Sequence, residues 1–134
     1  MESINISFGV TLIESNAFKG CSKLKSASIP SSVKCISSYS FDGCTLLEHV
    51  TIPSSVTSIE KCAFNECSYL THVIFESPSS IMIIETETFN KCTSLMEIEI
   101  PFSVKTMESK SFNECKSHRY QIMHFMNVVH LEMW

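Results

Sequence analysis

A Phe-x-x-Cys unit recurs along the chain at an almost constant interval, and this repeat constrains the fold more than any other feature. Successive cysteines of these units are 23, 23, 25 and 23 residues apart. A period of about 20–50 residues is typical of solenoids, propellers and arrays, in which each unit buries its apolar face only against its neighbours. The units contain Phe18/Cys21, Phe41/Cys44, Phe64/Cys67, Phe89/Cys92 and Phe112/Cys115.

Between these units lies a Leu-x-x-apolar-x-apolar segment, followed by a proline and a branched aliphatic residue, as in 47–56. Apolar residues at alternate positions predict a short strand with one buried face, which the proline ends because it has no N–H to donate. We expect the serines after the proline to bond the backbone of the turn, and the chain then to return along an opposite wall. The pattern predicts a short parallel β-solenoid whose stacked coils share one core.

The repeat divides the chain into an array over 1–117, which starts with a half repeat at 1–10, and a tail over 118–134. In the tail, the residues no longer match the apolar and proline positions of the repeat. Ile122, Phe125 and Val129 fit helical spacing there, so one interpretation is a capping helix at the C-terminus. The other interpretation is a degenerate repeat.

The 25-residue interval indicates an insertion of two residues, which we place in a loop at 80–84. The ends of the array suggest a second expectation. An open end of a repeat array exposes core residues and unpaired strand edges. We therefore expect either self-association through uncapped ends or that the chain is a piece of a longer array.

The repeats are similar to a known family. The segment IEKCAFNECSYLTHV at 59–73, preceded by IPSSV at 52–56, resembles the BspA-like leucine-rich repeats found in surface antigens of bacteria and parasitic protists. The resemblance covers about 4–115. It implies a right-handed, curved leucine-rich-repeat solenoid, mostly β with few or no long helices and with the Leu-x-x-Ile-x-Ile segments on the concave wall. It also implies adhesion to host or matrix proteins and a place at the cell surface.

The cysteines and phenylalanines of the repeat are predicted to be core. Zinc sites need ligand pairs two to four residues apart, which a 23-residue period does not supply. Equivalent thiols in stacked coils are expected to be reduced and buried, since thiols rank among the most buried side chains. The Phe column is expected to stack in the interior.

Composition and motifs exclude several classes of function. Asp42 is the only aspartate and no Gly-x-Ser-x-Gly motif occurs, so we predict no catalytic residue and no enzyme. We also predict no cofactor and no metal. The net charge of −4, without a basic patch, argues against nucleic-acid binding. No apolar run reaches the roughly 18 residues of a membrane span, so we predict no membrane insertion.

The outward positions of the strands are the best candidate binding surface, because curved solenoids present extended faces to partners. His49 and His72 fall in one column, which Glu97 continues, but three ligands in an open row make a poor metal site. The alternative is that these residues are simply exposed to solvent and bind no partner. The predicted concave, partner-binding face comprises Ser26, Ser28, His49, Thr51, His72, Ile74, Glu97 and Glu99.

These observations support two hypotheses about function. The first is a non-catalytic protein-interaction or adhesion module that binds an unidentified protein through the concave face. The alternative is a structural fragment, or a degenerate member of a larger repeat family, with no independent partner. Localisation stays open: the family implies a cell surface, whereas unpaired cysteines and the absence of a visible signal peptide at 1–15 favour the cytoplasm.

Overall fold

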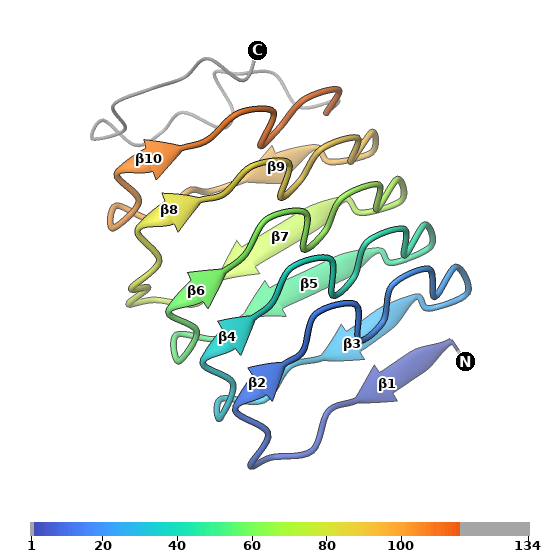
Figure 1. Cartoon of the computed structure of the whole chain (residues 1–134), viewed down its shortest axis with the longest axis horizontal. Coiled ribbons are helices and arrows are strands. Elements are labelled where there is room, and N and C mark those ends of the chain that lie inside the picture. The colour runs from blue at the N-terminus through green and yellow to red at the C-terminus, as the bar shows by residue number, and fades with distance from the viewer. Residues whose placement is uncertain (1, 116–134) are drawn as a thin grey trace.

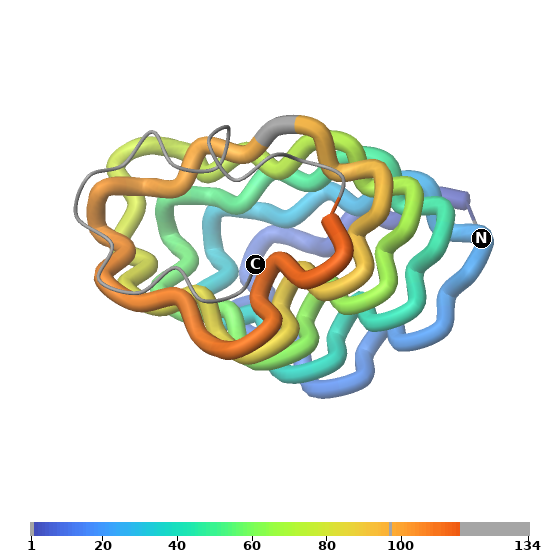
Figure 2. Tube along the Cα trace, turned by 90° about the horizontal axis from the view of Figure 1, so that it is seen from above, coloured from blue at the N-terminus to red at the C-terminus, as the bar shows by residue number. Residues whose placement is uncertain are grey.

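The chain winds into a stack of parallel coils, shown by a computed structural model that describes residues 2–115 (Figure 1). Within this range, five strands form one wall as a parallel sheet in the order β1-β3-β5-β7-β9. Figure 2 shows the coils lying over one another with similar outlines. The predicted parallel solenoid is confirmed. The strands are Ser3–Asn5, Ser26–Ser28, His49–Ile52, His72–Phe75 and Glu97–Ile98.

The opposite wall carries strands of two residues each, arranged in the described residues as a three-stranded sheet β2-β4-β6 and a pair β8-β10. Residues 2–115 contain no helix that could cross a membrane. Both interpretations of the tail at 118–134, capping helix or degenerate repeat, lie outside the described residues. The strands of this wall are Leu12–Ile13, Cys35–Ile36, Ser58–Ile59, Ile83–Ile84 and Thr106–Met107.

Strand β5 shows how the sequence sets the orientation of a coil. His49 and Thr51 are exposed, whereas Val50 and Ile52 are buried. This alternation is the period of a strand with one face on the core. The serines after the prolines act as predicted, because their Oγ atoms donate hydrogen bonds to the preceding coil. The bonds run from Ser32 to the Val10 carbonyl, from Ser55 to Val33 and from Ser103 to Ile81, at 2.8, 2.7 and 2.6 Å.

The phenylalanines of the repeat stack through the interior, as predicted. Successive ring centroids lie 5.2, 5.2, 5.6 and 5.4 Å apart from Phe18 to Phe112. The rings of Phe41 and Phe64 are nearly parallel, with an interplanar angle of 3°, and both are fully buried. Parallel-displaced rings at this separation attract one another beyond their area of contact.

The cysteines of the repeat are free thiols, and those of the second to fifth units hydrogen-bond to the preceding coil. The Sγ atoms of Cys44, Cys67 and Cys92 each donate to the carbonyl of a Phe in the preceding coil at 3.2 Å. Burial raises the pKa of Cys44 to about 12 and that of Cys67 well above its ordinary range. Because the thiolate is the reactive form, these groups are structural, as the repeat pattern predicts.

A row of side-chain amides, which the sequence analysis did not predict, follows the phenylalanines. Asn113 Nδ2 donates to Asn90 Oδ1 at 3.0 Å, Asn90 Nδ2 to Asn65 Oδ1 at 2.9 Å, and Asn65 Nδ2 to Asp42 Oδ1 at 2.8 Å. Lys19 Nζ lies 3.7 Å from Asp42 Oδ2. The amide row therefore links four successive coils and ends on a carboxylate that pairs with a lysine.

The insertion lies earlier than the sequence analysis placed it. Strand β7 keeps the register of β5 as far as Ile52↔Phe75. Ile81, however, accepts the Ser103 bond as Val33 accepts the Ser55 bond, so it occupies the same column. The two extra residues therefore lie between Phe75 and Ile81, and the placement at 80–84 was wrong. Ile81 and Ile84 are both buried in the apolar columns, so the extra length falls in the polar segment 76–80.

The insertion lies between the repeat units of Phe64 and Phe89, and we call the contact between the coils of these two units the joint. Across it, β6 and β8 belong to separate sheets, and β7 and β9 pair over two residues, compared with four for β5 and β7 and one for β3 and β5. The segment 62–67 keeps the joint continuous, because its backbone N–H groups bond the next coil. These bonds run from Cys62 to Thr86, from Phe64 to Thr88 and from Glu66 to Asn90, at 3.0, 3.0 and 2.8 Å.

Four of the five strands of the opposite wall are followed by a glutamate in the equivalent position: Glu14, Glu60, Glu85 and Glu108. Burial raises the pKa of the half-buried Glu85 above its ordinary value of 4.5, and the negative charges of Glu108 and Glu60 raise it further. The folded protein therefore holds the proton of Glu85 more tightly than the unfolded chain does.

We expect Glu85→Gln to raise the melting temperature at pH 7.5. In the wild type, stability falls as the pH rises from 4.5 through the higher pKa of folded Glu85, because folding then has to ionise a disfavoured carboxyl. The neutral amide removes this loss, so the gain should shrink toward pH 4. Calorimetry across this range measures it, with the exposed Glu76→Gln as control. A gain that is the same at pH 4 and pH 7.5 would contradict the assignment.

Candidate binding face

The predicted row of outward residues lies on the five-stranded sheet. The register aligns Ser26, His49, His72 and Glu97 on adjacent strands, as the repeat phase predicts. Ile74 is 55% exposed, which is unusual for an isoleucine in the middle of a sheet. We call the outer surface of this sheet the sheet face. Its exposed members from the predicted row are Ser26, Ser28, His49, Thr51, His72, Ile74 and Glu99.

The two histidines of the row lie side by side. Their ring centroids are 5.6 Å apart and the rings are tilted by 45°. Thr71 Oγ1 lies 3.4 Å from His49 Nδ1 and 3.0 Å from His72 Nδ1, so one hydroxyl links both rings. These contacts fix the rings in the centre of the sheet face. The described residues contain no group of three His, Cys, Asp or Glu side chains suited to a metal ion.

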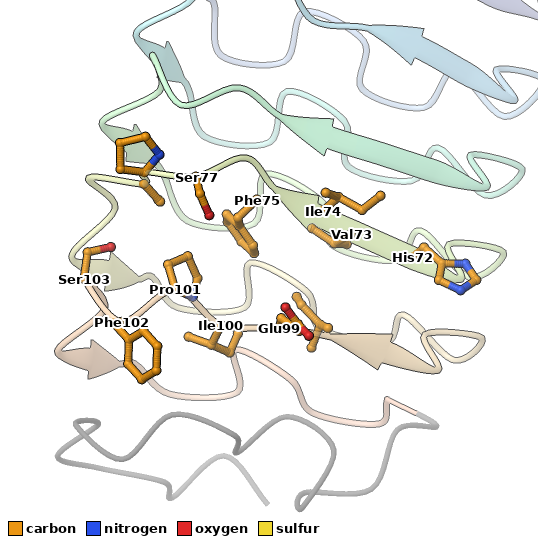
Figure 3. Close-up of a pocket in the computed structure, with 13 residues that line it drawn as sticks. His72, Val73, Ile74, Phe75, Ser77, Glu99, Ile100, Pro101, Phe102 and Ser103 are labelled. Carbon is orange, nitrogen blue, oxygen red and sulfur yellow. The ribbon is translucent and has the colours of Figure 1, made fainter.

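A groove of about 640 Å³ opens on the sheet face at the joint, and we call it the joint groove. Its volume lies within the range of about 300–1,000 Å³ typical of ligand pockets. Figure 3 shows the side chain of Phe75 extending from the β7 coil toward the coil that carries Ile100 and Pro101. The groove brings together His72, Ile74 and Glu99 of the predicted row. Ser26, Ser28, His49 and Thr51 lie on strands outside it.

Phe102 is a lining residue of the groove that the sequence analysis missed. It is 61% exposed and follows Pro101, where the other repeats have a serine: Ser31, Ser54 and Ser79. This departure from the Pro-Ser-Ser pattern was a readable signal. A second signal was Pro78, which follows its repeat cysteine by eleven residues, whereas the other prolines follow theirs by nine.

The charge of the groove is negative. Among its lining residues, Glu99 is the charged side chain, and no Lys or Arg is part of the lining. The exposed Glu76 adjoins the lining residue Ser77. The groove thus combines exposed apolar side chains with the carboxylate of Glu99, which suits a ligand that has apolar and cationic groups.

The sequence and the fold were compared with known proteins. The family model described as "BspA type Leucine rich repeat region" matches residues 1–119 in six copies. The search of curated proteins found no significant match. A T. pallidum leucine-rich repeat protein (TpLRR) is 34% identical, with a TM-score of 0.79 over 85% of this chain and 55% of its own.

Two further bacterial structures resemble this solenoid. The pneumococcal vaccine antigen PcpA is 29% identical, with a TM-score of 0.78 over 85% of this chain and 28% of its own. A leucine-rich repeat protein of Eubacterium ventriosum is 22% identical, with a TM-score of 0.77 over 86% of this chain and 31% of its own, a likeness of fold alone. The chain spans about half the length of the T. pallidum protein and about a third of the other two.

Proposed function

The chain belongs to the BspA-type leucine-rich repeat family, and on this premise we propose that it is a non-catalytic protein-interaction or adhesion module whose protein partner binds the sheet face. The observation that carries the proposal is the sheet face itself, an aligned row of exposed polar side chains that passes into the apolar joint groove. Repeat solenoids use extended faces of this kind to bind partners.

The similarity to a vaccine antigen adds support for adhesion as the biological setting. Matrix and cell-surface proteins are therefore the first partners to test. The histidine pair suits the centre of an interface, because its rings are held by Thr71 and already have a fixed geometry. A surface with fixed side chains loses less conformational entropy when a partner binds.

The test is surface plasmon resonance against immobilised, purified extracellular-matrix and cell-surface proteins. The double variant Ser28→Arg/Thr51→Arg places two bulky charges on β3 and β5, outside the joint groove. We expect it to weaken binding at least about tenfold, since residues near the centre of an interface dominate its energy. Ser109→Arg, at an exposed position outside the sheet face, is the control.

Two results would overturn the proposal. One is the absence of binding to any protein of the panel by the folded wild-type chain. The other is an equal loss of binding in the face variant and in Ser109→Arg, which would place the contact elsewhere on the solenoid. Thermal melts of the variants establish that both remain folded.

A further inference from the structure

The sheet wall opens at the joint and leaves an edge within it. Strands β5 and β7 pair over four residues, from His49↔His72 to Ile52↔Phe75. Strands β7 and β9 pair only at His72↔Glu97 and Val73↔Ile98. Pro101, farther along the same coil, has no N–H to donate. The side of Ile74–Phe75 that faces the next coil is therefore a strand edge without a register partner among the described residues.

The surroundings of this edge define the chemistry of a ligand. Ile74 and Phe102, exposed by 55% and 61%, provide apolar contacts on the two coils that border the groove. Glu99 provides a negative charge in the lining, and the exposed Glu76 precedes the lining residue Ser77 in the insertion. Exposed strand edges recruit extended peptides through their backbone groups, while neighbouring pockets select the side chains.

We propose that the joint groove binds an extended peptide segment of a partner protein, in which an apolar residue is flanked by Lys or Arg. The peptide lies along Ile74–Phe75, its apolar side chain enters between Ile74 and Phe102, and its cation faces Glu99. This inference rests on the proposed function and names the recognition element of the partner. The insertion, which no other repeat of the chain contains, is what creates the site.

The test begins with a phage-displayed library of random linear octapeptides, selected on the immobilised chain. We expect the enriched sequences to place Lys or Arg next to Val, Ile, Leu or Phe. Synthetic copies of these peptides are then titrated in solution by fluorescence anisotropy against wild type and variants.

Two groove variants should weaken binding of the selected peptides. Ile74→Asp is expected to weaken it about tenfold to hundredfold, because an apolar contact is lost and a charge is introduced. Glu99→Lys is expected to weaken it about tenfold and to shift a fresh selection toward acidic peptides. Met82→Asp should leave binding unchanged, since Met82 is exposed to a similar degree, 59%, but lies outside the groove.

Failure of the inference and failure of the proposed function are distinguishable. No enrichment, an acidic or neutral consensus, or equal affinity in wild type and Glu99→Lys overturns the inference. In that case the proposed function still holds if the wild-type chain binds a matrix protein and the double variant Ser28→Arg/Thr51→Arg does not. Self-association abolished by Glu99→Lys in light scattering would assign the groove to a second copy and overturn the peptide assignment. If Ile74→Asp does not fold, peptide binding by Glu99→Lys still tests the inference, because Glu99 is exposed.

Discussion

Phe64→Ala is expected to lower the free energy of unfolding by about 3–5 kcal/mol, the cost of removing a large buried aromatic side chain. Phe64 is fully buried, with its ring centroid 5.2 Å from that of Phe41 and 5.6 Å from that of Phe89. The substitution leaves a cavity and removes two stacked pairs. Because domains are stable by about 5–15 kcal/mol in total, the variant should unfold at much lower denaturant concentration.

Urea denaturation followed by circular dichroism measures this loss. Phe64→Leu, which retains more of the volume, should lose less and keeps the test informative if the alanine variant does not fold. Phe102→Ala is the matched control: its side chain is 61% exposed, so we expect a change within about 0.5 kcal/mol. Equal losses in Phe64→Ala and Phe102→Ala would show that the aromatic stack does not stabilise the array.

The second large effect is expected at the amide row. Asn90 is 4% exposed, donates to Asn65 Oδ1 and Glu87 Oε2, and accepts from Asn113 Nδ2. Asn90→Leu preserves the shape but leaves partners on both sides without their bonds. Because an unsatisfied buried polar group costs about 1–3 kcal/mol, we expect a loss of about 2–4 kcal/mol.

A double-mutant cycle with Asn65→Leu tests whether the row acts as a unit. We expect a coupling energy of about 0.5–3 kcal/mol, as found for residues in one hydrogen-bond network. Asn5→Leu, at an exposed position of β1, is the control and should change stability little. Strict additivity of Asn65→Leu and Asn90→Leu would mean that each amide contributes separately and that no network exists.

The repeat columns predicted the core of the fold because equivalent positions in stacked coils share one environment. Phe64 and Cys67 recur at fixed spacing, so their burial and stacking followed from periodicity alone. The amide row escaped prediction for a physical reason. Asn65, Asn90 and Asn113 each follow the repeat phenylalanine, so the column was visible in the sequence. Asparagine suits an exposed turn equally well, however, and its burial becomes evident only when its neighbours complete its hydrogen bonds.

The insertion was detected as a change of period but misplaced by several residues. Ile81 and Ile84 fit apolar columns, and Pro78 resembles the other strand-ending prolines. The indication that was missed is the distance of Pro78 from Cys67, eleven residues instead of nine, which places the extra residues between Phe75 and Pro78. The alternation of β5 and β7 correctly predicted the outward row. The joint groove could not be predicted, because it depends on how far two coils separate.

The joint also determines how the array comes apart. In repeat proteins, stability is roughly a sum over units and the interfaces between neighbours, so opening begins at the weakest interface. At the joint the opposite wall is interrupted between β6 and β8, and the sheet wall has two residue pairs; β3 and β5 share only one pair, but beside them the opposite wall continues from β2 through β4 to β6. The joint is held by segment 62–67, the Phe64–Phe89 stack and the Asn65–Asn90 bond. We therefore expect the solenoid to unfold as two cooperative blocks, one on each side of the joint, and a ligand bound in the joint groove to stabilise the contact between them.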